Sequence, residues 1–184
     1  MARSYLQQYR QCPSAFYNQR PSDNVDMLVI HNISLPAGQF GTPHVEQLFT
    51  GCIDCDAHDS FHDLKGLEVS SHFFIARTGN VTQFVAMDKR AWHAGVSCFE
   101  GRDGCNDFSI GIELEGTDVD AYEDAQYESL VSLAAEIINA YPAITLSRIV
   151  GHSDIAPGRK TDPGEAFDWH RFKQALLQRL PQLA

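Results

Sequence analysis

Two histidines and one aspartate in this chain have the residue types that a catalytic zinc ion takes from a protein. His31 and His152 each follow an apolar run and precede polar, turn-forming residues. Asp162 comes directly before Pro163, and the residue before a proline is biased toward extended geometry, which projects its side chain from a loop. Two imidazoles and a carboxylate leave one position of a tetrahedral zinc ion open for water. The set therefore predicts a metal-dependent hydrolase.

Two carboxylates and a lysine are candidates for acid–base or charge-stabilising work beside that metal. Glu113 and Glu115 lie in an apolar run typical of a buried strand, where a lone carboxylate is costly unless it is paired or lies near a cation. Both point to the same face at the strand period of two, so the pattern alone does not rank them. Lys160 belongs to an Arg159-Lys160 pair in a loop, and a solvated basic pair is the simpler interpretation of it.

A cysteine-histidine cluster offers a competing metal site. Cys52, Cys55, His58 and His62 include the ligands of a Cys2His2 zinc finger. Only two residues separate the second cysteine from the first histidine, whereas a finger needs ~12 there to build its turn and helix. A redox pair would open a helix after a strand, and the Gly51 break does not supply that setting. We therefore interpret the two cysteines as structural or incidental thiols.

Other reactive side chains receive plainer interpretations. His72 and His93 could flank the site, and we expect them to be supporting or core residues rather than metal ligands. A thiol enzyme using Cys98 or Cys105 is not favoured, because neither cysteine has a recognisable nucleophile setting.

The elements that carry these residues predict an α/β fold with a central mixed β-sheet flanked by helices. Apolar runs predict strands, with a hairpin joining the second to the third, over 25–33, 72–76, 81–85, 108–114 and 148–151. His31 and His152 fall at the carboxyl ends of strands, where open α/β sheets place their ligands. Helical periodicity predicts one helix that Pro142 ends and a last helix that begins at the N-cap Asp168.

The length of the chain predicts one domain spanning 1–184. Its 184 residues, of which 43% are hydrophobic, can build one substantial core. Residues 1–24 are polar and turn-rich, and we expect them to form an N-terminal arm. Proline and glycine break up the stretch 35–64, which contains one expected short helix over 45–49. Such a long connection is uncommon in a compact domain unless it carries function, often as a wall or lid over a site.

Composition favours a small soluble substrate. The formal net charge of -10 and the pI near 5.1 weigh against nucleic acid, anionic lipid or an intact anionic cell wall as the binding partner. The first residues contain no apolar run that could form a signal-peptide core, and no stretch approaches transmembrane length. Five cysteines without framework spacing favour reduced thiols. We expect a cytoplasmic, monomeric enzyme with no nucleic-acid or membrane partner.

Several segments of the chain resemble the zinc-dependent N-acetylmuramoyl-L-alanine amidases of the peptidoglycan-recognition fold. The likeness is closest to the cytosolic AmpD-type enzymes, which act on 1,6-anhydro-N-acetylmuramyl-L-alanine, and it extends from about residue 25 to residue 172. The segments that carry it include His31-Asn32-Ile33-Ser34-Leu35-Pro36, Ala91-Trp92-His93-Ala94-Gly95, Gly111-Ile112-Glu113-Leu114-Glu115-Gly116, Gly151-His152 and Arg159-Lys160-Thr161-Asp162-Pro163-Gly164.

The resemblance implies a role for each of the candidate residues. It implies that His31, His152 and Asp162 bind one zinc ion. It also ranks Glu113 as the catalytic carboxylate and Lys160 as the residue that stabilises the transition state.

The resemblance further implies where the substrate binds. Asn32 and Trp92 match positions that line the groove for the sugar-peptide ligand, and Arg102 matches a position that helps hold a peptide carboxylate. Glu68 and Gly104 stand where basic residues are expected in AmpD-type chains. This departure affects the recognition of the peptide carboxylate, not the chemistry.

The implied activity is hydrolysis of the amide between the lactyl group of N-acetylmuramic acid and L-alanine in soluble muropeptides, as part of cell-wall recycling. Zinc lowers the pKa of a bound water, and Glu113 removes its proton during attack on the amide carbonyl. In more distant relatives a tyrosine precedes the histidine that matches His72. Ser71 stands there in this chain, so the burden of proton transfer falls on Glu113.

Two other functions fit the resemblance less well. A non-catalytic muropeptide-binding module is expected to lack a zinc ligand, and this chain retains all three. A secreted or wall-acting autolysin is expected to carry an export signal or wall-binding repeats. The sequence leaves open how strictly the anhydro sugar is required, which stem peptides are accepted and whether the 35–64 connection moves.

Overall fold

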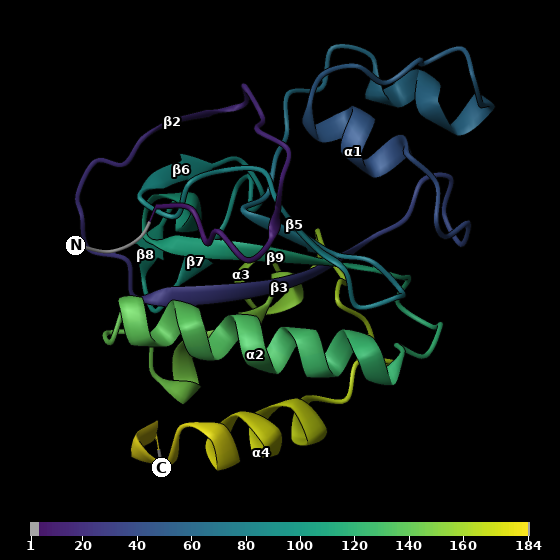
Figure 1. Cartoon of the computed structure of the whole chain (residues 1–184). Helices are drawn as coiled ribbons and strands as arrows, with labels where there is room; N and C mark the ends of the chain where they lie inside the picture. Colours follow the sequence, from purple (N-terminus) through teal and green to yellow (C-terminus); the bar gives the residue numbers. More distant parts are fainter. Residues whose placement is uncertain (1–3, 184) are drawn as a thin grey trace.

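A six-stranded mixed sheet lies at the centre of the molecule (Figure 1). The structure is a computed structural model that describes residues 4–183. The order of the strands across the sheet is β1 (Arg10–Gln11), β5 (Val81–Gln83), β4 (Phe73–Ile75), β9 (Ser109–Glu115), β3 (Met27–Ile33) and β10 (Ile149–Gly151). The β4–β5 pair is the predicted hairpin and is antiparallel, whereas the other neighbours run parallel. The predicted fold class is confirmed.

The two faces of the sheet bury different side chains, because neighbouring residues of a strand point in opposite directions. On β3, Leu28 and Ile30 belong to the main hydrophobic core, together with residues of the long helices. Met27 and Val29 point the other way, into a smaller core beyond the opposite face. His31 follows the parity of Met27 and Val29, so its side chain lies on the face that the long helices do not cover.

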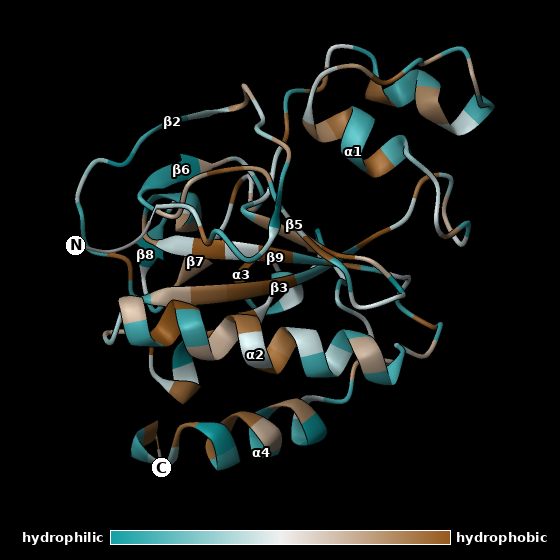
Figure 2. Ribbon diagram, viewed as in Figure 1, coloured by the Kyte–Doolittle hydropathy of each residue, from teal (hydrophilic) through white to brown (hydrophobic). Residues whose placement is uncertain are grey.

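Two long helices cover the first face. Helix α2 (Asp124–Ala140) lies against the sheet, and α4 (Trp169–Arg179) packs outside it (Figure 1). The apolar residues of both helices gather on the sides that face the core (Figure 2). Asp168 caps α4 as predicted, since its carboxylate accepts a hydrogen bond from the Arg171 N–H at 2.9 Å. None of the helices within residues 4–183 has the length and apolar character required to cross a membrane.

The polar stretch before residue 25 contributes strands that its composition did not reveal. β1 adds an edge strand to the central sheet beside β5, and β2 (Tyr17–Gln19) pairs with β6 (Lys89–Ala91). Strand β1 is only two residues long and β2 is exposed along its whole length. Strands this short and exposed lack the alternating apolar pattern from which a strand is recognised.

The stretch 35–64 lies to one side of the sheet (Figure 1). It contains α1 (His44–Phe49), which matches the predicted short helix, and a 3-10 helix over Asp59–Leu64. Val45, Leu48 and Phe49 of α1 pack into a third core together with Phe84, Val85 and Ala91. The remaining short elements are the hairpin β7–β8 (Cys98–Phe99 and Arg102–Asp103), the helix α3 (His152–Ile155) and the 3-10 turns Cys105–Asp107, Leu146–Arg148 and Pro181–Leu183.

Candidate metal centre and active site

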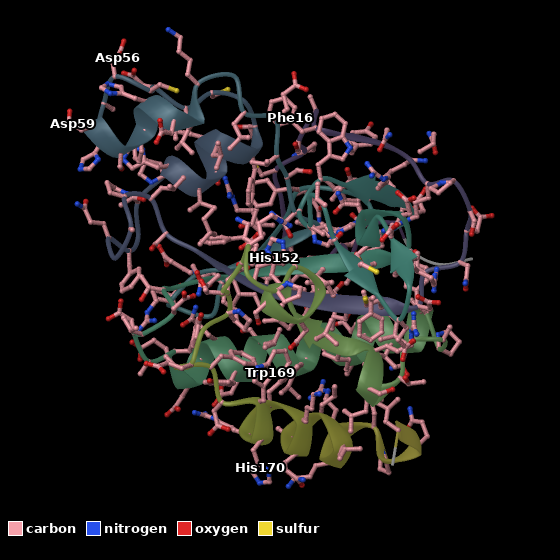
Figure 3. The ribbon with its side chains drawn as sticks, turned by 180° about the vertical axis from the view of Figure 1, so that it is seen from behind. Phe16, Asp56, Asp59, His152, Trp169 and His170 are labelled. Carbon is pink, nitrogen blue, oxygen red and sulfur yellow. The ribbon has the colours of Figure 1, made fainter. Side chains whose placement is uncertain are left out.

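Strand register brings the central candidates together in one row. His31 on β3 is the direct neighbour of Glu113 on β9. On the other side of β3, Gly151 of β10 pairs with Ile30, so the next residue, His152, is delivered beside His31. These positions lie at the carboxyl ends of parallel strands, and Figure 3 places His152 near the middle of the molecule. Three adjacent strands therefore supply an acid and two imidazoles to one place.

Asp162 completes a compact triad with the two histidines. Nδ1 of His31 lies 3.0 Å from Nδ1 of His152 and 3.1 Å from Oδ2 of Asp162, which itself lies 3.0 Å from Nδ1 of His152. Within residues 4–183 this is the one set of three or more histidine, cysteine or acidic side chains whose ligand atoms lie within 4.8 Å of one another. The loop that carries Asp162 is held in place by its own backbone, since the Ser153 N–H donates to the Asp162 carbonyl at 3.0 Å.

The donor set and its spacing suit a zinc ion. Donor atoms about 2.0–2.2 Å from a tetrahedral zinc ion lie roughly 3.3 Å apart, close to the separations in the triad. Burial lowers the pKa of His31 to about 4, so its imidazole is neutral at neutral pH, as a metal ligand requires. Burial opposes ionisation of Asp162, but hydrogen bonds with His152 and His31 outweigh it, and the pKa of Asp162 lies below its usual value.

The structure separates the two glutamates that the strand pattern left unranked. Glu115 connects two loops to the strand, because its carboxylate accepts hydrogen bonds from the backbone N–H groups of Gly41 (2.5 Å) and Arg77 (2.9 Å). Glu113 faces the triad, with Oε1 4.0 Å from Nδ1 of His31. Its other oxygen, Oε2, is buried and has no hydrogen-bond partner among the described residues. The carboxylate beside the metal site is therefore the one left free.

The surroundings of Glu113 favour its protonated form. Burial raises the pKa of Glu113 well above the usual value, and the negative charge of Asp162 raises it further. The positive charge of Lys160 acts in the opposite direction. A carboxylate with a raised pKa is a stronger proton acceptor once ionised, which is the property of a general base.

A cavity of about 250 Å³ opens over the triad. His31, His152, Asp162 and Glu113 form its floor, and the remaining lining residues include Asn32, Leu48, Phe49, Leu64, Leu67, Trp92, His93 and Lys160. A second cavity of about 580 Å³ adjoins it and shares Asn32, Ile33, Lys160 and Asp162. The two together form an extended region in which Asp162 and Lys160 line both cavities.

The basic pair Arg159-Lys160 divides into two different roles. Nη2 of Arg159 donates to the backbone carbonyls of Ala94 (2.7 Å) and Val96 (2.6 Å), so this guanidinium ties two loops together. Lys160 is exposed and lines both cavities. The interpretation as a solvated pair is therefore too simple, because only tertiary packing distinguishes the two side chains.

The three residues expected to contact substrate are found in different places. Asn32 and Trp92 line the cavity over the triad, and Nδ2 of Asn32 donates to Asp118 at 2.9 Å. Arg102 lies on β8 and lines neither cavity. It donates to the carboxylate of Asp26 at 2.7 Å and lies over the Phe108 ring. The structure does not bring Arg102 to the triad, and its role at a peptide carboxylate stays a prediction.

The residues that sequence analysis set aside lie outside the triad. Cys52 is exposed and Cys55 is half-buried, on the stretch after α1, and Figure 3 shows neighbouring Asp56 at the outer edge of the molecule. His72 is fully buried beneath the site and accepts a hydrogen bond from the Gly111 N–H at 3.0 Å. His93 contacts His31, with 2.9 Å between His93 Nδ1 and His31 Nε2. The sequence predicted that His93 could flank the site, but it did not predict this direct contact with His31.

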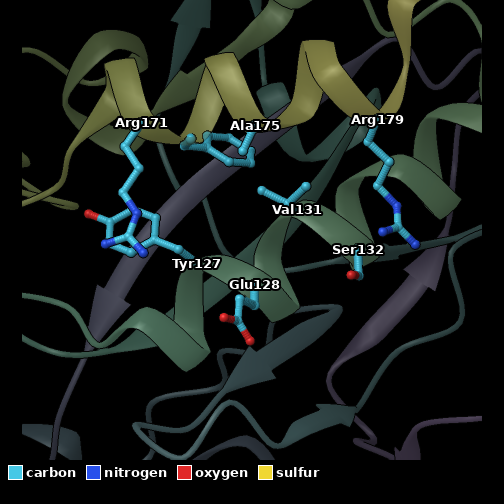
Figure 4. A pocket seen from close by; sticks show the side chains of 8 residues that line it. Tyr127, Glu128, Val131, Ser132, Arg171, Ala175 and Arg179 are labelled. Atoms are coloured by element: carbon cyan, nitrogen blue, oxygen red, sulfur yellow. The ribbon is translucent and has the colours of Figure 1, made fainter.

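A further cavity of about 270 Å³ lies between α2 and α4, away from the triad (Figure 4). Its lining consists of Tyr127, Glu128, Val131, Ser132, Arg171, Phe172, Ala175 and Arg179. Arg171 is already engaged, since it pairs with Asp124 at 2.8 Å and lies over the Tyr127 ring. The triad and Glu113 line the cavity described first, not this one.

A His-His-Asp donor set and a free buried carboxylate at an open cavity are the arrangement expected of a metal-dependent hydrolase. Residues 21–165 match the N-acetylmuramoyl-L-alanine amidase family model. The chain belongs to this family and is an N-acetylmuramoyl-L-alanine amidase.

Individual relatives agree with this membership. The chain is 56% identical to the 1,6-anhydro-N-acetylmuramyl-L-alanine amidase AmpD of Enterobacter cloacae, over 94% of this chain and 92% of that protein. A crystal structure of a selenomethionine AmpD derivative has a TM-score of 0.92 and 53% identity, with 95% of this chain and 97% of that chain covered. The amidase AmiD of Escherichia coli, solved with its substrate anhydro-N-acetylmuramic acid-L-Ala-D-γ-Glu-L-Lys, has a TM-score of 0.62 and 31% identity, with 86% and 60% covered.

Proposed function

We propose that this amidase hydrolyses the amide between the lactyl group of 1,6-anhydro-N-acetylmuramic acid and L-alanine in soluble muropeptides, as a monomer in the cytoplasm. The observation that carries the proposal is the triad with Glu113 beside it on the floor of an open cavity. The names of the AmpD relatives and the substrate in the AmiD complex support the choice of ligand. The acidic balance of the chain suits a soluble fragment better than an anionic wall.

We propose that His31, His152 and Asp162 hold one zinc ion per chain. When bound, zinc acts as a Lewis acid and lowers the pKa of a water molecule. Nitrogen and oxygen donors from two histidines and one carboxylate suit zinc better than magnesium or calcium, which prefer oxygen ligands alone.

Glu113 then transfers the proton. Its free, buried carboxylate accepts the proton of the attacking water and returns it to the nitrogen of the leaving amine. Lys160 lines the cavity from the loop that also carries Asp162, and its ammonium group stabilises the negative charge that develops on the carbonyl oxygen. Asn32 and Trp92 bind the substrate in this proposal, and Arg102 would contribute at a peptide carboxylate only from outside the cavity.

Metal content tests the site directly. His152→Ala should bind strongly reduced zinc by elemental analysis, because it removes one of three protein ligands. Cys52→Ala should retain one zinc per chain and serves as the matched control. Full zinc occupancy in His152→Ala, or loss of zinc in Cys52→Ala, would defeat the assignment.

Substrate comparison tests the reaction. Purified enzyme should release peptide from soluble anhydro-muropeptide faster than from intact sacculi, and a chelator should abolish both activities. Equal or higher rates on intact sacculi would favour a wall-acting autolysin instead. Binding of muropeptide without any cleavage would favour a recognition module. Light scattering should give the mass of one 20.5 kDa chain.

A further inference from the structure

One short segment contacts both histidines of the triad from behind. Nε2 of His31 lies 2.9 Å from Nδ1 of His93, and Nε2 of His152 lies 3.0 Å from the backbone carbonyl oxygen of Ala94. In both triad histidines Nδ1 faces Asp162, so Nε2 is the nitrogen left for these contacts. Residues 93 and 94 therefore meet the rear nitrogen of each expected metal ligand.

The partners of His93 determine where its proton lies. The Ser109 hydroxyl donates to the Cys105 carbonyl at 2.6 Å, and the same oxygen lies 3.2 Å from Nε2 of His93. Since the hydroxyl proton is already used, Ser109 Oγ accepts from the N–H at Nε2 of neutral His93. Nδ1 of His93 is then the acceptor, and the proton between the two rings sits on Nε2 of His31.

We propose that His93 is a positioning residue that fixes His31 in the tautomer protonated at Nε2 and so presents Nδ1 of His31 to the metal. This inference rests on the proposed zinc site. The Ala94 carbonyl fixes His152 in the same way, because a carbonyl oxygen can only accept. A hydrogen bond behind a metal-bound histidine sets its orientation and raises its basicity as a ligand.

The surroundings of His93 hold it in place for this task. The Asn106 side-chain oxygen accepts from the backbone N–H groups of His93 (3.1 Å) and Ala94 (2.8 Å). Gly111 leaves the space that the ring occupies, because a Cβ at this position would lie 2.6 Å from Cγ of His93. The His93 ring packs directly over Gly111, and this explains why β9 has a glycine two residues before Glu113.

Two substitutions of His93 separate positioning from packing. His93→Leu keeps an apolar side chain of similar bulk without an acceptor, whereas His93→Asn keeps an acceptor oxygen near the place of Nδ1. We expect zinc affinity, measured by competition with a chelator, to fall about 10–100-fold in His93→Leu. His93→Asn should stay close to wild type. The thermal midpoint of the metal-free protein, measured for both variants, reports any loss of packing separately.

The outcomes distinguish this inference from the zinc site itself. Wild-type zinc affinity in His93→Leu, or an equal loss in both variants, would overturn the positioning role. Absence of stoichiometric zinc in the wild-type protein would instead overturn the proposed function, and this inference with it. If neither His93 variant folds, Ser109→Ala gives the answer, because it removes the acceptor behind His93 while leaving the imidazole in place; the lost hydrogen bond to the Cys105 carbonyl is monitored by the same thermal midpoint. Ser109→Ala should lower zinc affinity relative to the wild-type protein, and an unchanged affinity would overturn the inference.

Discussion

The floor and the wall of the catalytic cavity are built in different ways. On the floor, His31, Glu113 and His152 lie at or directly after the ends of β3, β9 and β10, whose backbones are fixed by parallel pairing, and Asp162 comes from the loop that follows α3. The wall residues Leu48, Phe49 and Leu64 come from the long connection over 35–64, which packs into a core separate from the main one. Sites carried on rigid elements are more precise than sites on loops. We expect chemistry to depend on the floor and substrate fit to depend on the wall.

The largest effect should come from the floor. Glu113→Gln removes the proton acceptor while keeping the shape of the side chain, so kcat should fall ~10²–10⁴-fold with zinc retained. Glu115→Gln is the matched control on the same strand and should retain most of its activity, since Glu115 holds loops rather than facing the triad. Steady-state kinetics and zinc content should be measured on both. A slower Glu115→Gln enzyme would mean that the base has been misassigned.

Lys160 tests whether chemistry extends beyond the floor. Lys160→Ala should lower kcat ~10²–10³-fold, the range for loss of one group that stabilises an oxyanion, and should keep its zinc. Lys65→Ala removes the same charge from an exposed position that does not line the cavity, and it should be nearly silent. A change in KM alone for Lys160→Ala would place this residue with the substrate-binding wall.

The packing beneath the floor should be sensitive to acid. Burial, with help from the charge of Arg20, lowers the pKa of His72 to about 3, below the unfolded value near 6.5. Between these values the unfolded chain binds one proton more than the native protein, so stability is complete above pH 6.5 and falls as pH drops. The expected slope is about 1.4 kcal/mol per pH unit in that window.

Denaturant unfolding of metal-free protein between pH 7 and 4 measures this dependence. His72→Asn keeps an acceptor for the Gly111 N–H but cannot titrate, so its stability should change less steeply with pH. Parallel curves for the two proteins would mean that other groups account for the acid sensitivity.

The smallest effect should come from the wall. Gly51 has a positive φ of 73°, and a Cβ there would lie 2.8 Å from Cζ of Phe16, whose ring stacks on Trp92. Gly51→Ala should displace these rings and raise KM several-fold with little change in kcat. Gly101→Ala imposes the same backbone strain at φ 80° with no neighbour within 4 Å, so it controls for strain alone. Equal effects of both substitutions on KM would remove the wall from substrate binding.

Sequence patterns determined the elements and the residue types of the site. Continuous apolar runs predicted β3 and β9, which are buried along most of their length, and helical periodicity predicted α2 and α4. His31 and His152 could be identified because each is a polar residue that directly follows an apolar run. Asp162 could be identified because it directly precedes Pro163. The strands of residues 10–19 were not, since they are short and exposed and are recognised only through their pairing with β5 and β6.

Only the tertiary structure decided how equivalent residues differ. Glu113 and Glu115 lie on the same strand, point to the same face and carry the same type of side chain. They differ because the backbone N–H groups of Gly41 and Arg77 donate hydrogen bonds to Glu115 and not to Glu113. Arg159 and Lys160 also differ in their contacts, because only Arg159 donates hydrogen bonds to the backbone carbonyls of Ala94 and Val96. A sequence specifies local periodicity and donor types, because these depend on neighbouring residues. Which donor remains free depends on contacts across the fold, and these follow from the packing of segments that are far apart in the chain.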